Sequence, residues 1–360
     1  MNKNFWRNKK VLITGHTGFK GSWMTLILSD LGAKITGYAL NPIEKRNLFD
    51  DLNLTKYLAN DYRDNILNLN KIKKVINNIK PHIIFHLAAQ SSVLVSYKDP
   101  KDTINTNVMG TTNLLEASKQ CKSLRSLVIA TTDKVYLNLE KKIPFSENDN
   151  LGGHDIYSGS KAATEIITQS YKKSFFQNNK CNIATVRSGN CIGGGDWTRD
   201  RIVKDCAENF LKNKKLTIRY PNATRPWQHV MEPIFGYIKL SEKLFNNNKY
   251  SGAWNFGPRK KNNLKVIDVA KYGKSFLKSN SLIKIKRSKL YESINLSLNS
   301  SKSFKLLKWK TRMNAKQALS LSFEWYKFFY ENKSKIKIKE FTFKQINYYK
   351  KILKKANNEM

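Results

Sequence analysis

The stretch KVLITGHTGFKG, residues 10–21, combines an apolar run with a glycine-rich turn. The apolar run at residues 10–14 is typical of a short buried strand, and the turn that follows opens a helix towards Leu31. In such a turn Gly15 permits the tight bend, Gly18 lets the backbone approach a pyrophosphate, and Gly21 lets helix and strand pack closely. The pattern therefore predicts a phosphate-binding turn at a helix N-terminus, where amides and the helix dipole stabilise an anion.

Strand-like and helix-like segments alternate from Val11 to Arg187. The predicted strands are residues 34–39, 83–86, 126–130 and 182–187, and the predicted helices include residues 106–119 and 157–172. This alternation predicts an α/β fold built on a doubly wound parallel sheet of the Rossmann type. Ligands bind at the carboxyl ends of the strands in such sheets, where the glycine turn, residues 86–89 and residues 132–134 all fall.

Turn signals cluster after Arg187, at Gly189-Asn190 and at residues 193–195, and there we expect a second set of elements to begin. A smaller, mixed α/β substrate-binding domain is predicted towards the C-terminus. The predicted division is residues 1–187 and 228–258 for the dinucleotide domain, 188–227 and 259–330 for the substrate-binding domain, and 331–360 for a lysine-rich C-terminal extension.

The extension contains two patterns. Residues 335–339 alternate lysine and isoleucine like an edge strand, and a helical stripe of four apolar residues follows, Phe343, Ile346, Tyr349 and Leu353. We expect the extension to pack against the body of the protein or against a partner chain.

Tyr157 stands four residues before Lys161, after an apolar strand that ends near Thr132-Asp133-Lys134. At about 1.5 Å rise per residue, positions i and i+4 lie above one another on a helix, so the two side chains can share a pocket. A phenol has an ordinary pKa of about 10, and an adjacent cation favours the phenolate, which can take a proton from an alcohol while hydride leaves the same carbon. Alone, the spacing also fits a packed tyrosine followed by a solvated lysine.

Composition restricts the class of protein. The 360 residues carry 65 Lys plus Arg against 27 Asp plus Glu, a formal charge of +38. The lysines are spread along the chain without an arginine-rich stripe or aromatic platform, so we expect weak, salt-sensitive polyanion binding and no specific nucleic-acid partner. The four cysteines and five histidines show no metal-ligand spacing, and we assign no metal. No apolar stretch has the length of a membrane span or signal peptide, so a soluble, cytoplasmic protein with free thiols is expected.

The motifs resemble the extended short-chain dehydrogenase/reductase family, from about Phe5 to about Tyr330. The similar segments are the glycine turn, His86 to Gln90, Asn107 to Thr111, Tyr157 to Lys161 and Arg225 to Val230. Within that family, residues 15–23, 193–197 and 225–229 are most similar to the CDP-glucose 4,6-dehydratases. The resemblance implies a nucleotide-sugar substrate, a hydro-lyase activity in deoxysugar and lipopolysaccharide O-antigen biosynthesis, and a homo-oligomer, dimer or tetramer. Another nucleotide-sugar 4,6-dehydratase or a 4-epimerase is the alternative.

The resemblance also implies tightly bound NAD that is regenerated in each turnover. The implied cofactor-binding residues are Gly15, Thr17, Gly18, Phe19, Lys20, Gly21, Asp61, Leu87, Ala88, Ala89, Tyr157 and Lys161. Asp61 would contact the adenine, although a turn or capping aspartate is the alternative. NADP stays open because Asn41, and not an acid, follows the second strand, with Lys45 and Arg46 close behind.

In the dehydratases that this sequence resembles, hydride leaves carbon 4 of the hexose, water is lost across carbons 5 and 6, and the hydride returns to carbon 6. The implied catalytic residues are Thr132, Asp133, Lys134, Tyr157 and Lys161. Thr132 would bind the carbon 4 oxygen, and Asp133 would protonate the departing hydroxyl. Lys134 would remove the carbon 5 proton, and as a base it must be neutral, which burial and neighbouring positive charge favour.

Fewer residues match the family at the nucleotide end of the site. Arg225 matches the family arginine that meets the substrate diphosphate, and Gln90, Asn190 and Arg201 are the other candidate substrate-binding residues. Either Trp197 or Trp227 could stack on the base, but a core position is the commoner place for an aromatic side chain of this size.

Overall fold

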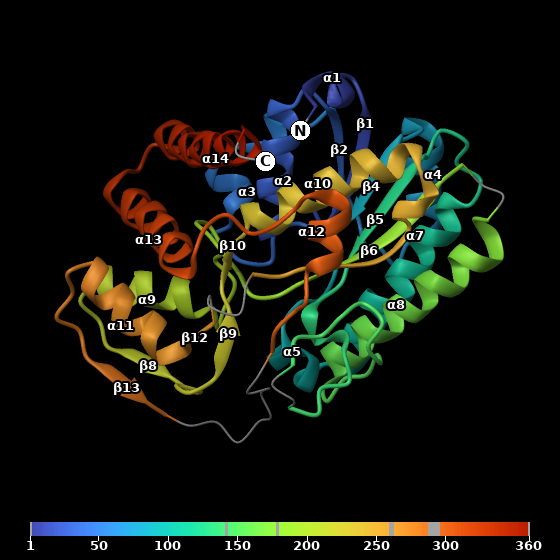
Figure 1. The fold of residues 1–360 in the computed structure, drawn as a ribbon. Helices are drawn as coiled ribbons and strands as arrows, with labels where there is room; N and C mark the ends of the chain where they lie inside the picture. Colours follow the sequence, from blue (N-terminus) through green and yellow to red (C-terminus); the bar gives the residue numbers. More distant parts are fainter. Residues whose placement is uncertain (1, 141–142, 178–179, 259–262, 287–295, 359–360) are drawn as a thin grey trace.

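A computed structural model of the chain describes residues 2–140, 143–177, 180–258, 263–286 and 296–358. At its centre is a seven-stranded sheet in the order β11-β6-β5-β4-β1-β2-β3 (Figure 1). Each neighbouring pair in the sheet is parallel. The strands are β1 (Lys10–Thr14), β2 (Lys34–Ala39), β3 (Asn60–Arg63), β4 (Ile83–His86), β5 (Ser126–Ala130), β6 (Asn182–Ser188) and β11 (Gly252–Phe256).

Helices cover both faces of this sheet (Figure 1). On one face lie α2 (Phe19–Asp30) and α10 (Met231–Asn246), and on the other lie α4 (Leu69–Ile79), α7 (Gly110–Ser118) and α8 (Ile156–Phe175). Side chains alternate between the faces along β1, because Val11 and Ile13 join the core beneath α2 whereas Leu12 joins the core beneath α4 and α7. The doubly wound parallel sheet predicted from the sequence is therefore confirmed.

Most predicted elements have the expected bounds. Four of the strands, β1, β2, β4 and β5, match the prediction, and β6 continues one residue further, to Ser188. The helix predicted at residues 106–119 begins as a π-helical turn, η2 (Asn105–Met109), before α7. Two strands of this sheet, β3 and β11, were not predicted. The first is polar, Asn60-Asp61-Tyr62-Arg63, and forms at the sheet edge by pairing with β2, so its sequence carries no apolar alternation.

The glycine-rich turn has the geometry that its sequence predicts. Gly15 has φ +75°, and a methyl group there would lie 2.6 Å from the backbone nitrogen of Ala88. A methyl group on Gly21 would lie 2.2 Å from the Gly15 carbonyl oxygen. Both positions therefore require glycine, one for its backbone conformation and both for the close approach of neighbouring backbone.

A second, smaller group of elements lies beside the sheet (Figure 1). Its helices are α9 (Ile202–Leu211), α11 (Val266–Phe276) and α13 (Ala315–Glu331). Three strand pairs accompany them, β7 (Cys191–Ile192) with β10 (Gln228–His229), β8 (Leu216–Ile218) with β13 (Ile283–Ile285), and β9 (Thr224–Pro226) with β12 (Asn263–Lys265). This group is the mixed α/β part that the sequence predicts. Residue 259, where the second predicted substrate-binding segment begins, lies outside the described residues.

The remaining elements are short, apart from the C-terminal helix. They are α1 (Lys3–Trp6), α3 (Leu48–Asp51), η1 (Leu54–Tyr57), α5 (Val93–Lys98), α6 (Pro100–Ile104), η3 (Asp133–Val135), η4 (Asn248–Tyr250), α12 (Ser301–Leu307) and α14 (Lys335–Asn358). Although α12 belongs to the predicted substrate-binding segment, it packs on the sheet edge, where Ser303 donates to the carbonyl of Asn255 at 2.6 Å. Within the described ranges, no helix combines the length and apolar character needed to cross a bilayer.

The C-terminal extension corrects one prediction. Residues 335–339 do not form the predicted edge strand; they are the first residues of α14. The predicted stripe does face the protein body: Ile346 and Tyr349 are fully buried, and Phe343 and Leu353 pack against the same core. Tyr349 also donates a hydrogen bond of 2.5 Å to the buried carboxylate of Glu232. A helix places these apolar side chains on one face, and this burial outweighs the local alternation at residues 335–339.

Replacing Ile346 by alanine should lower the free energy of unfolding by about 2–5 kcal/mol, because the side chain is fully buried and its removal leaves a cavity. Urea unfolding followed by circular dichroism measures this effect. The exposed Lys351 on the same helix provides the control, and Lys351→Ala should leave stability nearly unchanged. Equal stabilities for Ile346→Ala and the unmodified protein would mean that α14 is not part of the cooperatively folded core.

Candidate active site

The predicted site residues at the ends of β1 and β4 lie in direct contact. The amide of Leu87 donates to the carbonyl of Thr14 at 3.0 Å, and the amide of Ala88 lies 3.4 Å from the Thr14 hydroxyl oxygen. The helix that follows the turn, α2, is preceded by Gly18, and no side-chain cap for it is present among the described residues. Its first turn therefore offers backbone amides and the positive end of a dipole, which fits a dinucleotide pyrophosphate.

Asp133 lies buried at the end of β5, in the short 3₁₀ helix η3, and is 2% exposed. Burial raises the pKa of its carboxyl above the ordinary value, against the opposing effects of Lys134, Thr132 and Arg225. Thr132 donates a hydrogen bond of 3.1 Å to Oδ1 of Asp133. Oδ2 is buried without a hydrogen-bond partner among the described residues. A carboxyl in this setting retains its proton more readily than an exposed one, as a general acid requires.

Tyr157 lies on the first turn of α8 and is 9% exposed. Burial raises the pKa of its hydroxyl, whereas a hydrogen bond with Thr132 and the charge of Lys20 lower it, Asp133 raises it, and Arg201 lowers it. The hydroxyl of Tyr157 therefore faces Thr132 and Asp133, and the structure brings three of the predicted catalytic residues together.

Lys161 follows one turn later and is 4% exposed. Its amino group donates to the carbonyl oxygen of Ala130 at 2.9 Å. Burial, helped by the charge of Lys20, lowers the pKa of Lys161 to about 8, and Glu165 opposes this shift. The ammonium is thus anchored at the end of β5. Among the cations that lower the pKa of Tyr157, Lys20 has the largest effect.

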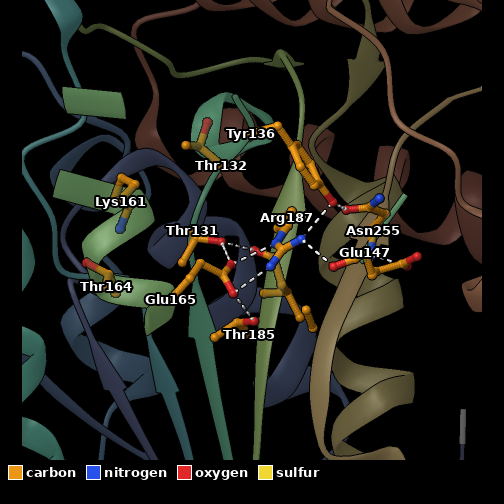
Figure 2. A network of polar contacts seen from close by, with 12 residues as sticks. Thr131, Thr132, Tyr136, Glu147, Lys161, Thr164, Glu165, Thr185, Arg187 and Asn255 are labelled. Carbon is orange, nitrogen blue, oxygen red and sulfur yellow. Dashed lines mark hydrogen bonds and ion pairs between the residues drawn. The ribbon is translucent and has the colours of Figure 1, made fainter. Parts of the chain in front are cut away.

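A buried ion pair lies beneath these residues (Figure 2). Glu165 on α8 is fully buried and accepts two hydrogen bonds of 2.9 Å from the guanidinium of Arg187 on β6, which is 1% exposed. Thr131 and Thr185 each donate to the same carboxylate, at 2.5 Å and 2.6 Å. Three of the four hydrogen bonds to Glu165 come from β6, and the fourth comes from Thr131, which follows β5 and directly precedes Thr132.

The pair continues into a wider network in Figure 2. Arg187 also donates to the Tyr136 hydroxyl at 2.7 Å and to the carbonyl of Glu147 at 3.2 Å. The Tyr136 hydroxyl donates in turn to Asn255 on β11 at 2.7 Å. This network joins α8, β6 and β11 to Thr131, and it therefore holds the chain directly before Thr132.

The four predicted substrate-binding residues lie in different settings. Both ends of the Gln90 side-chain amide are hydrogen-bonded nearby, since Nε2 donates to the carbonyl of Ser92 at 3.0 Å and to Thr103 on α6 at 2.8 Å, and Oε1 accepts from the amide of Ser92. Arg225 is buried on β9, and its charge lowers the pKa of Asp133. The side chain of Arg201 is 41% exposed, and its charge lowers the pKa of Tyr157. Asn190 is partly buried and its carbonyl accepts from the amide of Gln228 at 3.2 Å.

Asp61 lies in β3 and not in a turn or a helix cap. Its carboxylate receives two hydrogen bonds from Arg63, at 2.7 Å and 2.8 Å, and lies 2.9 Å from Nε2 of His16 in the glycine turn. Burial lowers the pKa of His16 to about 4, although Asp61 opposes this shift. Asp61 is therefore held beside the glycine turn by His16 and Arg63, and its contact with the adenine stays a prediction.

Neither candidate stacking tryptophan offers a free ring face. Trp197 is 6% exposed and lies among Trp325, Tyr326 and Phe329, and its indole nitrogen donates to Asp51 at 2.8 Å. Trp227 is 3% exposed and donates to a backbone carbonyl. Both are core residues, as the alternative in the sequence analysis held.

Sequence reasoning missed several residues of the site. Glu165 stands four residues after Lys161 on the same helix, so this spacing could have placed its acid on the sheet-facing side. No comparable signal marks Arg187 or the direction of the Lys20 side chain. In the described part of the chain, no cluster of three His, Cys, Asp or Glu residues is arranged to hold a metal ion.

Solved structures with the same fold include nucleotide-sugar enzymes. A UDP-glucose 4-epimerase from Thermotoga maritima, solved with UDP-glucose, superposes with a TM-score of 0.78 at 19% identity, covering 89% of this chain and 99% of that one. A dTDP-glucose 4,6-dehydratase from Bacillus anthracis, solved with NAD, gives a TM-score of 0.75 at 22% identity over 89% and 97% of the two chains. These likenesses confirm the fold.

Sequence comparison is more specific. A CDP-glucose 4,6-dehydratase from Salmonella typhimurium is 38% identical over 335 residues, which are 91% of this chain and 93% of that protein. A dTDP-D-glucose 4,6-dehydratase from Dictyostelium discoideum is 27% identical over 73% of this chain and 61% of its own length. The family model described as GDP-mannose 4,6 dehydratase matches residues 12–321. Since this model and the Salmonella relative both span most of the sequence, the chain belongs to the GDP-mannose 4,6 dehydratase family, a family of nucleotide-sugar dehydratases.

Proposed function

We propose that this chain is a hydro-lyase that converts CDP-glucose into CDP-4-keto-6-deoxyglucose. The observation that carries the proposal is the buried carboxyl of Asp133, with its raised pKa, beside Tyr157. A hydride-transfer enzyme needs only a base for the sugar hydroxyl, whereas loss of water also needs an acid for the leaving group. The Salmonella relative, a CDP-glucose 4,6-dehydratase, supports CDP-glucose as the substrate.

The roles proposed for the residues are those that the family resemblance implies, and the burial of Asp133 and Tyr157 supports them. Bound NAD supplies the hydride acceptor for carbon 4 and the donor for carbon 6. Tyr157 takes the proton of the carbon 4 hydroxyl, and Thr132 binds the same oxygen. The resulting ketone acidifies the hydrogen on carbon 5, which Lys134 removes, while Asp133 protonates the hydroxyl that leaves carbon 6. Lys161, anchored on Ala130, holds the cofactor beside Tyr157.

NAD suits the glycine turn better than NADP. Two basic residues, Lys45 and Arg46, follow β2, and the guanidinium of Arg46 lies 5.0 Å from the ring centre of Trp197 and 5.2 Å from that of Phe329. A guanidinium stacked in this way is already committed to an aromatic cluster and is less available for a 2′-phosphate. Gly15, Thr17, Gly18, Phe19, Lys20, Gly21, Asp61, Leu87, Ala88 and Ala89 remain the proposed contacts to the cofactor.

A 4-epimerase or a dehydratase acting on another nucleotide sugar is the alternative. An epimerase needs no acid for a leaving hydroxyl, so the buried carboxyl of Asp133, whose pKa is raised by burial, favours dehydration. For the nucleotide, the proposed contacts are Arg201 and Arg225, together with Asn190, from the smaller group of elements and its connections to the sheet. Gln90 is proposed to shape the loop after β4, because its amide is already hydrogen-bonded there.

The wider setting is also a proposal. The four cysteines are free thiols, as expected in a reducing cytoplasm. Exposed apolar side chains near η2 and on α8, namely Ile104, Met109 and Ile166, support a homo-oligomer that pairs through these helices. The product would enter deoxysugar synthesis, including that of lipopolysaccharide O-antigen.

The test is a parallel assay of the purified protein with CDP-glucose, dTDP-glucose, UDP-glucose and GDP-mannose, in the presence of NAD. We expect a 4-keto-6-deoxy sugar to form fastest from CDP-glucose, identified by nuclear magnetic resonance of the product. An epimerised sugar that keeps its carbon 6 hydroxyl, or turnover confined to another nucleotide, would overturn the proposal.

A further inference from the structure

Residues 46–51, which include the four-residue helix α3, contact two parts of the protein that are proposed to bind different ligands. We call these residues the bridge segment. They lie in the connection between β2 and β3, and α3 contacts both α14 and α2, the helix of the glycine turn (Figure 1). A helix of four residues is not stable alone, so its neighbours must hold it in place.

Phe49 faces the glycine turn and is 1% exposed. Its ring lies nearly perpendicular to the His16 imidazole, with 5.3 Å between the ring centres. On the same ring, the guanidinium of Arg63 lies 4.7 Å from the centre. His16 and Arg63 are the two residues that hold Asp61 beside the turn, so the position of Phe49 sets the position of this cluster.

Three other residues of the bridge segment contact the turn at residues 193–197, which leads from β7 to α9. The carboxylate of Asp51 accepts a hydrogen bond of 2.8 Å from the indole nitrogen of Trp197, and the guanidinium of Arg46 lies 5.0 Å from the centre of the same indole. Leu48 packs on Gly195, where an added methyl group would lie 2.3 Å from its Cδ1. The bridge segment is therefore fitted to this turn by packing as well as by a hydrogen bond.

The same turn reaches a residue that is proposed to bind the substrate. Asp196 precedes Trp197, and its carboxylate lies 3.7 Å from Nε of Arg201, directly before α9. The bridge segment thus joins the glycine turn to the part of the protein that carries Arg201. Because α3 depends on contacts from both sides, a ligand that orders one side lowers the entropy cost of ordering the other side.

We propose that the bridge segment couples the two binding sites, so that NAD at the glycine turn and the nucleotide of the substrate in the smaller group of elements each bind more tightly when the other is present. Phe49 makes the contact on the NAD side, and Asp51 with Trp197 makes it on the substrate side. The inference rests on the proposed function, which supplies the two ligands. The hexose has no part in this coupling, because the contacts lie away from the Thr132 to Lys134 segment.

The test measures the affinity of the protein for CDP, by isothermal titration calorimetry, after removal of NAD and again with saturating NAD. CDP has no hexose that could contact the nicotinamide, so direct contact between the reacting groups of the two ligands does not contribute. We expect NAD to raise the affinity for CDP by about 5-fold or more, and CDP to raise the affinity for NAD by the same factor, because coupling between binding sites is reciprocal.

Two variants address the contact between the bridge segment and the turn. Trp197→Phe removes the indole N–H and keeps an aromatic ring, and it should reduce the coupling to less than about 2-fold. Asp51→Asn keeps an acceptor for the indole and should retain the coupling. Trp254→Phe is the matched control, because this fully buried indole donates one hydrogen bond of 2.8 Å to the carbonyl of Tyr250 and lies on β11, away from the bridge segment.

Equal coupling in Trp197→Phe and in the unmodified protein would overturn the proposal, as would the absence of coupling in the unmodified protein. If Trp197→Phe does not fold, Leu48→Ala removes the packing on Gly195, and the same loss of coupling is required. CDP is compared with UDP, dTDP and GDP, so that two failures are separated. Coupled binding of another diphosphate in place of CDP would contradict the proposed substrate alone, and binding of CDP without coupling would contradict the role of the bridge segment alone.

Discussion

Lys134→Ala should lower the kcat for dehydration by about 100- to 10,000-fold, the range by which a positioned general base or acid accelerates proton transfer. The residue follows Asp133 in η3 and is partly buried, and its charge lowers the pKa of the Asp133 carboxyl, which places its amino group near the proposed acid. Without it, the carbon 5 proton has no base, although Tyr157, Lys161 and the glycine turn are unchanged. The affinity for NAD should therefore stay close to that of the unmodified protein.

The measurement pairs steady-state kinetics with isotope incorporation. In deuterated water the unmodified protein should place deuterium at carbon 5 of the product, and Lys134→Ala should suppress this incorporation together with turnover. Lys122→Ala, at an exposed lysine in the loop before β5, is the control for the loss of a positive charge. Unchanged turnover in Lys134→Ala would remove Lys134 from the reaction.

Glu165→Gln should lower the free energy of unfolding by about 3–5 kcal/mol, because it leaves the Arg187 guanidinium buried without a charged partner. The pair is bidentate and both side chains are at most 1% exposed, so water cannot replace the lost charge. Activity should fall as well, because Thr131 donates to this carboxylate and directly precedes Thr132 in the chain. Loss of the carboxylate should therefore displace Thr132. Urea unfolding measures the stability, and kcat/KM measures the effect on the site.

A double-mutant cycle with Arg187→Met separates the pair from its surroundings. Each single variant leaves one buried charge, whereas the double variant leaves none and should regain part of the lost stability. The surface pair of Lys327 and Glu331 provides the contrast, because both are more than half exposed and Glu331→Gln should change stability by less than about 1 kcal/mol. Equal costs for the buried and the exposed pair would show that the network does not hold the site together.

The sequence determined the strands of the dinucleotide part because their apolar runs are buried on both faces of a parallel sheet, as Ile83 to His86 shows. The glycine turn was equally clear, since the φ of Gly15 and the contact at Gly21 leave no other residue type. At residues 335–339 the local alternation predicted a strand, and this prediction was wrong. Their isoleucines alternate with lysines, but Ile338 is buried in a core that also receives Ile346 and Tyr349, and only a helix serves all three.

The site was predictable as a set of strand ends but not as a set of contacts. In a parallel sheet, Gly15, Ala88 and Asp133 all lie at the carboxyl ends of the strands. Their proximity therefore follows from the alternation of strands and helices alone. The direction of a long side chain does not, and Lys20 is the example, because its partners Ser188 and Tyr237 come from β6 and α10. Packing between distant segments decides such contacts, and a local sequence motif does not predict them.

In the proposed reaction, the hydride that leaves carbon 4 of the sugar is the same hydride that later returns to carbon 6. CDP-glucose carrying deuterium at carbon 4 tests this directly, with the product examined by nuclear magnetic resonance and mass spectrometry and the nicotinamide followed by its absorbance. We predict that the deuterium appears at carbon 6 of the 4-keto-6-deoxy product, with no accumulation of reduced nicotinamide. Deuterium lost to solvent, or reduced nicotinamide rising in step with product, would contradict the account.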